Sequence, residues 1–458
     1  TNLEELVQKD SLVKYESLYL LARVFLEQKE YDKVIDINSA LAEKVDDNNM
    51  LARILFDLGL AYSKKGEDKE AISYYEKVLN QSLDRELSKI TSLELARSYY
   101  RLDRYQDVVI VLKDFDSKEA LELKIDAANK INNEEELITL YEEISNRYPE
   151  DPLAIEGYFV LAKSKYEKGE FQEAINIFQE IEDMTITDKM RQEINYWQGL
   201  SFYRLGDYAQ AEGYFYSINH VDGDEIAIRA LYMLGETCYK QEKYSEAIKH
   251  YQEFLKNFHY HSLADHVQYS VCWSYLNLGD YNMAIDMFDK LLEDYPESQF
   301  VEESNFLIGK IYFLAKDNDE ARVKLQHFIQ SFAKSSFVEE ALYILAQINL
   351  EEEKWIDSIL NFEKLIAHAP NSQYLPGALY GLSLSYFKKG EYEKALQVGD
   401  RYLSGYPSGT LVCDILYITA ICEEELGYQE QAKEKYEMIL QKCPETTYAD
   451  SVRRLLER

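Results

Sequence analysis

The stretch Asp280-Tyr281-Asn282-Met283-Ala284-Ile285-Asp286-Met287-Phe288 contains the pattern that decides the fold. From Tyr281 onward, apolar residues recur at positions 284, 285, 288, 291, 292 and 295, which is the spacing of one face of an amphipathic helix. The small residue Ala284 lies at the centre of the stretch, and we call the residue in this position the pivot. The same frame begins at Glu170, Asp207, Lys243 and Glu391.

Pivots recur along the whole chain, at Val34, Ala71, Val108, Leu137, Ala174, Ala211, Ala247, Ala284, Ala321, Ser358, Ala395 and Ala432. The successive spacings between them are 37, 37, 29, 37, 37, 36, 37, 37, 37, 37 and 37 residues. A nearly constant spacing over the whole chain is typical of a repeat architecture, in which each unit buries its apolar face against the next. The chain therefore contains about twelve copies of one short structural unit.

Other positions keep the same frame. Three residues before the pivot, eight repeats carry an aromatic residue: Tyr31, Tyr105, Phe171, Tyr208, Tyr244, Tyr281, Trp355 and Tyr392. Twelve residues before it, every repeat except the one with Ile125 carries a small residue: Ala22, Gly59, Ala96, Ala162, Gly199, Gly235, Cys272, Gly309, Ala346, Ser383 and Ala420. Twelve residues after it, proline stands at 149, 296, 370, 407 and 444.

These positions predict a pair of helices in each repeat. Small residues such as Cys272 and Ala284 let the two backbones approach closely. Pro296 and its equivalents stop the second helix, and Ser336-x-x-Glu339 predicts a capping box that starts the next one. Glycine accepts the left-handed backbone at which the first helix must end, and it stands at 66, 169, 206, 279, 390 and 427.

The repeated positions resemble the tetratricopeptide repeat (TPR), over essentially the whole chain. This resemblance implies an all-α, right-handed α-solenoid of about twelve helix–turn–helix repeats, with a concave surface that holds other proteins. Most repeats here have 37 residues, whereas the family usually has about 34, and the extra residues follow the helix stop. The junction Tyr295–Phe300, echoed at Pro370–Tyr374, is similar to bacterial envelope TPR proteins of the BamD and Tol–Pal-associated type.

One repeat departs from the rule, because the spacing from Val108 to Leu137 is eight residues short. We predict an N-terminal arm of three repeats at 1–112 and a degenerate short repeat at 113–148, where a kink is expected. An eight-repeat body follows at 149–446. The alternative is a deletion that the array absorbs without bending.

Both ends of the chain carry apolar residues at helical spacing. Residues 447–458 are expected to form a capping helix with Val452, Leu455 and Leu456 facing inward. Residues 1–10 carry Leu3, Leu6 and Val7 on one face, as if they finish an earlier helix. We therefore expect the protein to extend upstream, where any signal segment would lie.

Composition excludes several classes of function. The net charge of −33 argues against a nucleic-acid partner, and no apolar run approaches the length of a membrane span. Phosphate loops, nucleophile elbows and His-Glu-x-x-His motifs are absent, so we expect no enzyme, cofactor or metal site. His259, His261 and His266 are close in sequence, and we favour surface histidines over metal ligands there. The five cysteines, at 238, 272, 413, 422 and 443, are expected to be buried thiols.

The resemblance implies that the first helices line the concave groove. Aromatic residues stand fifteen and eight positions before the pivots, and basic residues gather along the first seven repeats. We predict that this stretch binds an acidic or carboxylate-bearing peptide, with Trp273 as an aromatic anchor. The alternative is that the rings pack and the cations form ion pairs between neighbouring helices. The predicted partner-binding residues are Arg23, Arg97, Arg101, Lys163, Tyr196, Tyr203, Arg204, Tyr232, Tyr239, Lys240, Tyr269, Trp273 and Lys310.

The sequence thus predicts a non-enzymatic scaffold that binds a protein or peptide, within a bacterial cell-envelope assembly. A self-assembling structural subunit and a cytoplasmic adaptor are the alternatives, and homo-oligomerisation is left open. The junction resemblance favours a periplasmic or envelope-associated location. Five unpaired cysteines would favour the cytoplasm.

Overall fold

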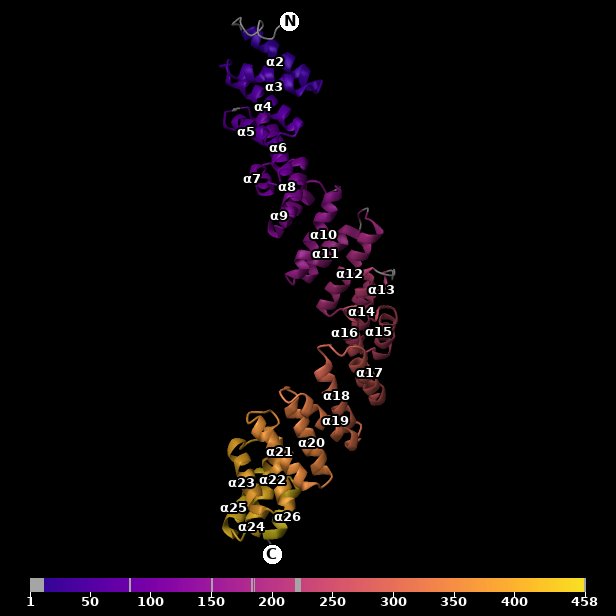
Figure 1. The fold of residues 1–458 in the computed structure, drawn as a ribbon. Helices are drawn as coiled ribbons and strands as arrows, with labels where there is room; N and C mark the ends of the chain where they lie inside the picture. The colour runs from indigo at the N-terminus through magenta and orange to yellow at the C-terminus, as the bar shows by residue number, and fades with distance from the viewer. Residues whose placement is uncertain are drawn as a thin grey trace. The chain divides into compact units, whose positions relative to one another are not determined.

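The computed structural model describes residues 12–81, 84–149, 151–182, 184, 186–218 and 224–456. These residues form 25 helices and no strand, so the predicted all-α solenoid is confirmed. The helices follow one another in antiparallel pairs (Figure 1).

Each repeat supplies a first and a second helix. The first helices are α2 (Leu12–Glu27), α4 (Asn48–Lys65), α6 (Arg85–Arg101), α8 (Lys118–Lys130), α10 (Pro152–Glu167), α12 (Asp188–Leu205), α14 (Glu225–Lys240), α16 (Ala264–Asn277), α18 (Val301–Leu314), α20 (Val338–Glu351), α22 (Leu375–Lys389) and α24 (Val412–Glu425). The second helices are α3 (Tyr31–Ala42), α5 (Asp68–Gln81), α7 (Tyr105–Val111), α9 (Glu134–Arg147), α11 (Phe171–Glu182), α13 (Tyr208–Tyr216), α15 (Tyr244–Phe258), α17 (Tyr281–Asp294), α19 (Asn318–Ser331), α21 (Trp355–His368), α23 (Tyr392–Gly405) and α25 (Gln429–Lys442). Helix α26 (Thr447–Leu456) follows the last pair.

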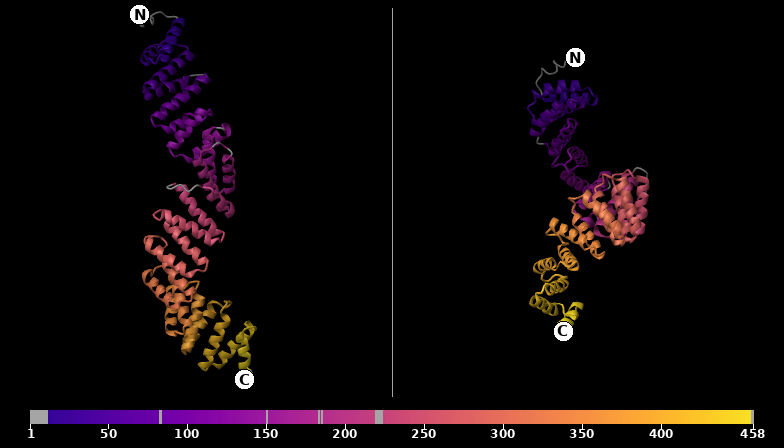
Figure 2. Two further views of the ribbon diagram at one scale, coloured as in Figure 1. Left: turned by 90° about the vertical axis from the view of Figure 1, so that its right-hand side faces the viewer. Right: turned by 60° about the horizontal axis from the view of Figure 1, so that its bottom comes forward.

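The chain divides into two compact units, residues 1–219 and residues 220–458, which we call unit 1 and unit 2. Unit 1 contains α2–α13, and unit 2 contains α14–α26. Within each unit the helices run in chain order, as two further views also show (Figure 2). The predicted repeat at 113–148 lies inside unit 1.

The turn between the two helices has a left-handed residue five positions before the pivot in all twelve repeats. Six of these residues are the predicted glycines, with φ between 77° and 83°. The other six are Lys29, Asp103, Asn132, Glu242, Lys316 and Glu353, with φ between 50° and 66°. The turn therefore requires this conformation even where the residue is not glycine, and glycine adopts it at the least cost.

Replacement of Gly206 by alanine should lower the free energy of unfolding by about 1 kcal/mol, because a Cβ is strained at a φ of +83°. No heavy atom lies within 4 Å of that Cβ, so the loss is one of backbone conformation. The control is Gly213→Ala in the middle of α13, also in open space, which should stabilise by about 0.5–1 kcal/mol. Chemical unfolding measures both variants, and equal effects would contradict the turn's role.

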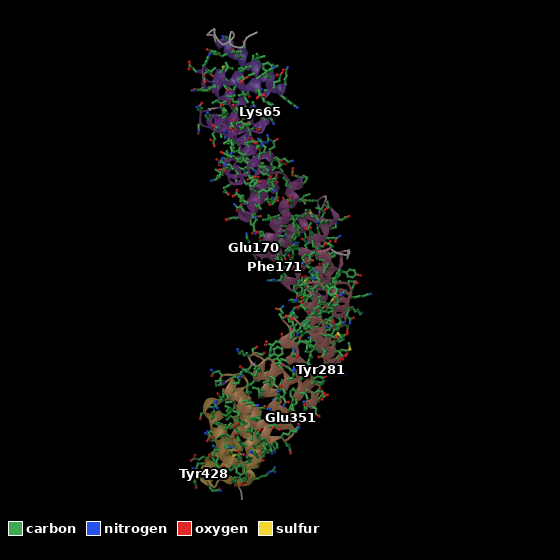
Figure 3. The ribbon with its side chains drawn as sticks, in the orientation of Figure 1. Lys65, Glu170, Phe171, Tyr281, Glu351 and Tyr428 are labelled. Carbon is green, nitrogen blue, oxygen red and sulfur yellow. A yellow bond between two sulfur atoms is a disulfide. The ribbon has the colours of Figure 1, made fainter. Side chains whose placement is uncertain are left out.

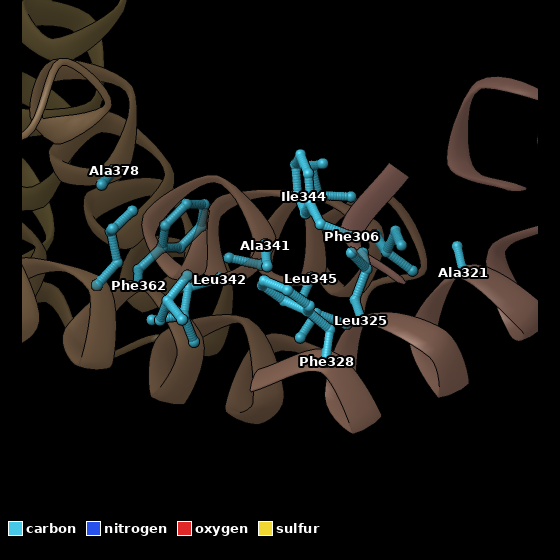
Figure 4. Packing of buried hydrophobic residues seen from close by; sticks show 14 of the residues in the cluster. Phe306, Ala321, Leu325, Phe328, Ala341, Leu342, Ile344, Leu345, Phe362 and Ala378 are labelled. Atoms are coloured by element: carbon cyan, nitrogen blue, oxygen red, sulfur yellow. The ribbon is translucent and has the colours of Figure 1, made fainter. Parts of the chain in front are cut away.

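Close packing within a pair depends on the small residue twelve positions before the pivot. A Cβ on Gly235 would lie 2.4 Å from the ring of Tyr251, and one on Gly199 would lie 2.7 Å from the ring of Phe215. Both rings stand four residues after a pivot. The small residue therefore makes room for a ring of the partner helix. The sequence had predicted only that it lets the two backbones approach. In unit 2, Phe306, Leu325, Phe328 and Leu345 interlock in one such buried layer (Figure 4).

The short repeat contains an ordinary helix pair. The side chains of Ser117 and Asn133 cap α8 and α9 by accepting hydrogen bonds from the backbone N–H groups of Ala120 and Glu136. The missing residues shorten the preceding second helix, since α7 has 7 residues where α17 has 14. The kink expected at this repeat stays a prediction.

The capping box predicted at Ser336-x-x-Glu339 is wrong. Helix α20 begins at Val338, and the Ser335 hydroxyl accepts a hydrogen bond from the N–H of Phe337 at 3.1 Å. The reason is that the junction forms its own turn, in which a serine two residues before the aromatic residue caps the backbone. Glu339 instead accepts a hydrogen bond from Ser372, in the next junction, at 2.6 Å.

The last helix is only partly as predicted. Ala449 and Val452 are fully buried against the preceding pair. Leu455 is 39% exposed, so its predicted inward position is wrong, because it lies off the strip that Ala449 and Val452 define. The side chain of Leu456 and residues 1–10 with Leu3, Leu6 and Val7 lie outside the described residues.

Two cysteines form a disulfide, which corrects the expectation of five thiols. Cys413 lies at the start of α24 and Cys443 follows α25, and their sulfurs are bonded. The helices are antiparallel, so these ends meet, with a Cα–Cα distance of 6.2 Å. Cys238, Cys272 and Cys422 are buried thiols as predicted. Burial raises the pKa of Cys422 to about 12, which keeps its sulfur protonated.

Loss of the disulfide should destabilise the last repeat by about 2–4 kcal/mol. The double variant Cys413→Ser/Cys443→Ser should therefore unfold its C-terminal end at a lower temperature. A solenoid confines such losses to neighbouring repeats. Reductant should lower the first unfolding midpoint of the wild type and leave that of the double variant unchanged. Thiol titration of the denatured chain should give three thiols before reduction and five after it.

Candidate functional site

The first helices line the inner side of the curved helical layer in each unit. Successive first helices approach one another, as α18, α20, α22 and α24 do in unit 2, and α2, α4 and α6 do in unit 1. Successive second helices come less close along the described chain. The layer with the shorter spacing is the concave one, so the predicted groove residues stand on helices that face it.

In unit 1, Arg101 forms hydrogen bonds with residues of the preceding repeat. Its guanidinium donates hydrogen bonds to the Asp68 carboxylate at 2.7–3.1 Å and to the Ser63 hydroxyl at 2.6 Å. Asp68 is 6% exposed at the start of α5. Burial by itself would raise the pKa of Asp68, but hydrogen bonds from Arg101 and Ser98 outweigh it and lower that pKa below its ordinary 3.8.

The variant Arg101→Ala should lose about 1–2 kcal/mol of unfolding free energy at pH 7, because it leaves a buried carboxylate without its cation and solvent screens part of the loss. A lowered carboxyl pKa gives stability that is present above pH 3.8 and is lost as the pH falls below it. The difference between wild type and variant should therefore shrink in acid. The control is Arg97→Ala, which removes a partly exposed pair with Glu94 on the same helix and should cost at most about 0.5 kcal/mol.

Arg23 and Arg97 also lie beside carboxylates. Arg23 is 4.0 Å from the buried Asp57, and Arg97 pairs with Glu94 at 2.5 Å and with Glu119 at 3.8 Å. Burial raises the pKa of Asp57 to about 6, although a hydrogen bond from Tyr19 and the charge of Arg23 oppose this rise. The pairs of Arg23 with Asp57 and of Arg97 with Glu119 match the alternative of ion pairs between neighbouring helices, whereas the pair of Arg97 with Glu94 lies within α6.

Two other cations of unit 1 lie over aromatic rings. The ammonium of Lys163 is 4.9 Å from the ring centroid of Trp197, and the guanidinium of Arg204 is 5.3 Å from that of Phe171, which begins α11 (Figure 3). Neither cation forms an ion pair with any described residue. The rings of Tyr196 and Tyr203 pack against Phe215 and Tyr208, with centroids 6.0 and 5.4 Å apart.

In unit 2, three predicted residues come together around a hollow of about 340 Å³. Glu236 and Tyr239 line it from α14, and Tyr269, Ser270 and Trp273 line it from α16. The hollow therefore opens between the first helices of two neighbouring repeats. It offers three aromatic rings around one carboxylate.

Hydrogen bonds hold the walls of this hollow in place. One oxygen of Glu236 accepts from the Tyr251 hydroxyl at 2.6 Å and from the Ser270 hydroxyl at 2.9 Å. The Asn277 amide donates to the Tyr239 hydroxyl at 2.9 Å. Burial, with the nearby Glu236 charge, raises the pKa of Tyr251, so its hydroxyl stays a donor.

The aromatic residues fifteen positions before the pivot serve mainly in packing. Tyr269 stacks on Phe300 of the next junction, with centroids 4.1 Å apart and planes 9° from parallel. Phe306 stacks in the same way on Phe337, and Tyr343 on Tyr374. Sequence reasoning missed this pairing, although an aromatic residue sixteen positions after three pivots was its signal.

The remaining predicted residues of unit 2 have separate surroundings. Lys310 pairs with Glu340 at 2.7 Å, and Tyr232 packs near Tyr251. Lys240 ends α14, is exposed, and forms no ion pair with described residues. Glu236 and Ser270, which complete the hollow, were not predicted.

The three histidines have different partners. His261 lies 3.1 Å from Glu225, while His266 contacts Asp265 and, through Nε2, the Gln299 amide at 3.0 Å. The ring of His259 lies against its neighbour Tyr260. His259 and His266 lie at the surface as favoured, whereas only 15% of the His261 side chain is exposed.

Family models match successive parts of the chain. A model described as an outer membrane lipoprotein (YfiO) matches residues 268–354 and 340–458. Models for intraflagellar transport protein 56 and for subunit 3 of the anaphase-promoting complex, or cyclosome, match residues 55–215 and 182–254. Together with twelve helix pairs in register, these matches decide the assignment. The chain belongs to the tetratricopeptide repeat superfamily.

Several solved structures, two of them titled as TPR proteins, are similar to this TPR chain. The C-terminal part of a TPR protein from Cytophaga hutchinsonii is 17% identical, with a TM-score of 0.47, over 56% of this chain and 98% of that one. Naa15/Naa10 bound to HypK-THB is 14% identical, with a TM-score of 0.43, over 92% and 68%. YrrB, "a TPR protein with an unusual peptide-binding site", is 18% identical, with a TM-score of 0.33, over 44% and 96%. No curated protein sequence matches, and the assignment rests on the repeat pattern and the family models.

Proposed function

We propose that this TPR chain is a protein-interaction scaffold, and that the concave face of unit 2 binds a partner polypeptide through the hollow beside Trp273. The observation that carries this proposal is the meeting of Tyr239, Tyr269 and Trp273 around Glu236. TPR solenoids are generally scaffolds without catalysis, and none of the described helices is long and apolar enough to cross a membrane.

The chemistry of the hollow favours a lysine or arginine side chain of the partner. Aromatic faces attract a cation, and the Glu236 carboxylate would neutralise it at the floor. The hydroxyls of Tyr251 and Ser270 occupy one carboxylate oxygen, which fixes the group without removing its charge. The net charge of −33 would also speed the approach of a basic partner.

An acidic partner segment stays a proposal for unit 1. There, Lys163 and Arg204 are the predicted cations that pair with no described carboxylate. Arg101, by contrast, is held by Asp68 and is not counted among the contacts with a partner.

We also propose an envelope location, over the cytoplasmic alternative. The Cys413–Cys443 disulfide supports it, because such bonds persist in oxidising compartments. The outer membrane lipoprotein model, which matches residues 268–354 and 340–458, supports it as well.

Peptides selected from a random display library on the immobilised chain should be enriched in lysine or arginine. The variant Trp273→Ala should weaken a selected peptide at least about 30-fold, the size of a binding hot spot, by calorimetry. Glu236→Gln keeps the hydrogen-bonding shape, removes the charge, and should cost about tenfold. Tyr260→Ala, at a residue 92% exposed outside the hollow, is the matched control and should bind normally.

Equal binding by wild type and Trp273→Ala would overturn the groove proposal. Selected peptides without basic residues would overturn the assigned chemistry. Self-assembly of the wild type that Trp273→Ala disrupts, without peptide binding, would favour the structural-subunit alternative.

A further inference from the structure

A second site lies among the second helices, at a repeated position that carries a ring in seven of the twelve repeats. Nine residues before the pivot, seven repeats carry an aromatic residue: Phe25, Tyr62, Tyr99, Phe202, Tyr275, Tyr312 and Tyr386. Tyr99, Tyr275 and Tyr386 reach the second helix of the preceding repeat, whereas Tyr62 and Phe202 stack on rings of the second helix of their own repeat. In the repeat of α20 the same position holds Asn349.

Three tyrosines in this position meet a polar residue at one and the same repeat position. Tyr99 donates its hydroxyl hydrogen to Glu76 at 2.9 Å, and Tyr386 donates to Glu363. The Gln252 amide approaches the Tyr275 hydroxyl at 3.4 Å. Glu76, Gln252 and Glu363 all stand five residues after the preceding pivot. The ring and this polar residue are therefore a repeated pair.

At Asn349 the partner is present and the ring is not. Gln326 stands five residues after the pivot Ala321, in the place of Glu76 and Gln252. A hollow of about 520 Å³ occupies the space, lined by Gln326 from α19, by Asn349 from α20, and by Lys354 and Asp357 at the start of α21. Its volume exceeds that of a phenol ring, so a side chain could enter from outside.

Two other walls of the hollow correspond to those around a tyrosine. The guanidinium of Arg104 lies 4.4 Å from the ring centroid of Tyr99 and pairs with Asp107 at 2.8 Å. Lys354 and Asp357 stand in the same two positions, four and one residues before their pivot, and both line the hollow. The lining differs at Arg322, which pairs with Glu352 and stands where the repeats before Tyr99, Tyr275 and Tyr386 have isoleucine.

Asn349 borders the hollow with its amide. The residue is 3% exposed, it has no side-chain hydrogen bond with described residues, and its amide atoms are not among the fully enclosed polar atoms that lack a partner. The amide is therefore accessible to a group that enters the hollow. Leu342 and Leu345 add apolar surface to the same hollow (Figure 4).

Two repeats have a charged residue in this position, and each forms an ion pair within the chain. Glu423 pairs with Lys435 at 2.8 Å, and Lys165 pairs with Glu170 at 2.6 Å. Ala128 and Cys238 are small, so Asn349 is the polar, uncharged exception, and it borders an open hollow.

We propose that this hollow receives a tyrosine side chain of a partner polypeptide. The ring would occupy the place that Tyr99 and Tyr386 occupy in their own repeats, with its hydroxyl on Gln326 and the ammonium of Lys354 over its face. Val323, Ile356 and Leu360, which are 59%, 68% and 47% exposed, offer apolar contact to residues beside that tyrosine. The site is separate from the hollow beside Trp273, so the two proposals can be tested independently.

The probe is p-cresol, the side chain of tyrosine as a free molecule. Saturation-transfer NMR on the whole chain should detect p-cresol with a dissociation constant of about 1 mM, and toluene should bind at least about fivefold more weakly because it lacks the hydroxyl. The variant Asn349→Tyr should place the chain's own ring in the hollow. It should weaken p-cresol binding at least about tenfold and raise the unfolding midpoint by about 2 °C.

The reciprocal variant Tyr386→Asn should open a second hollow and double the number of p-cresol sites. A crystal of the wild-type chain soaked in 4-iodophenol tests the site without any substitution, and an anomalous iodine peak beside Gln326 and Asn349 is expected. Water alone in the soaked hollow would overturn the proposal. So would equal binding of p-cresol by Asn349→Tyr and wild type, or binding of toluene as strong as that of p-cresol.

Discussion

The fold depends on the contact between a small residue of the first helix and a ring of the second. Gly235 under Tyr251 shows the constraint, since even one added carbon would lie 2.4 Å from the ring. This contact sets the distance between the two helices, and the left-handed turn sets their direction. Where the ring is tyrosine rather than phenylalanine, its hydroxyl reaches beyond the contact. At Tyr251 that hydroxyl holds Glu236, and so the packing contact also builds the floor of the concave hollow.

In the solenoid, some positions of each repeat provide stability, and other positions are free for recognition of a partner. Each repeat packs against its neighbours, so residues outside the packing positions can change without loss of the array. The concave hollow between α14 and α16 and the outer hollow between α19 and α21 each use positions of this kind. In unit 2, the disulfide joins the start of α24 to the residue after α25 and so links the two helices of one pair covalently.

The helix pairs, the left-handed turns and the buried small residues could be predicted from the sequence, because each is a local property repeated twelve times. Properties that depend on pairing in space could not. Cys413 and Cys443 are 30 residues apart, and only the antiparallel pair brings them together. Charge alone also did not separate Arg101, which Asp68 holds, from Arg204, which pairs with no described carboxylate. The sequence predicted the groove residues Tyr239, Tyr269 and Trp273. The role of Glu236 could be recognised only from its neighbours in space.

Exceptions in a repeated position indicate function only when the structure leaves the space beside them open. Glu423 departs from its aromatic position, yet one of its carboxylate oxygens pairs with Lys435, so the departure is a matter of packing and charge within the chain. Asn349 departs from the same position and gains no compensating partner, while the polar residue that its ring would have met is retained at Gln326. The repeat of α20 therefore lacks a ring but keeps a surface beside which a ring could lie. It has lost a contact within the chain and has kept the surface for that contact. An external ring restores that contact at a low ordering cost, because the surrounding walls are already held by the helices on either side.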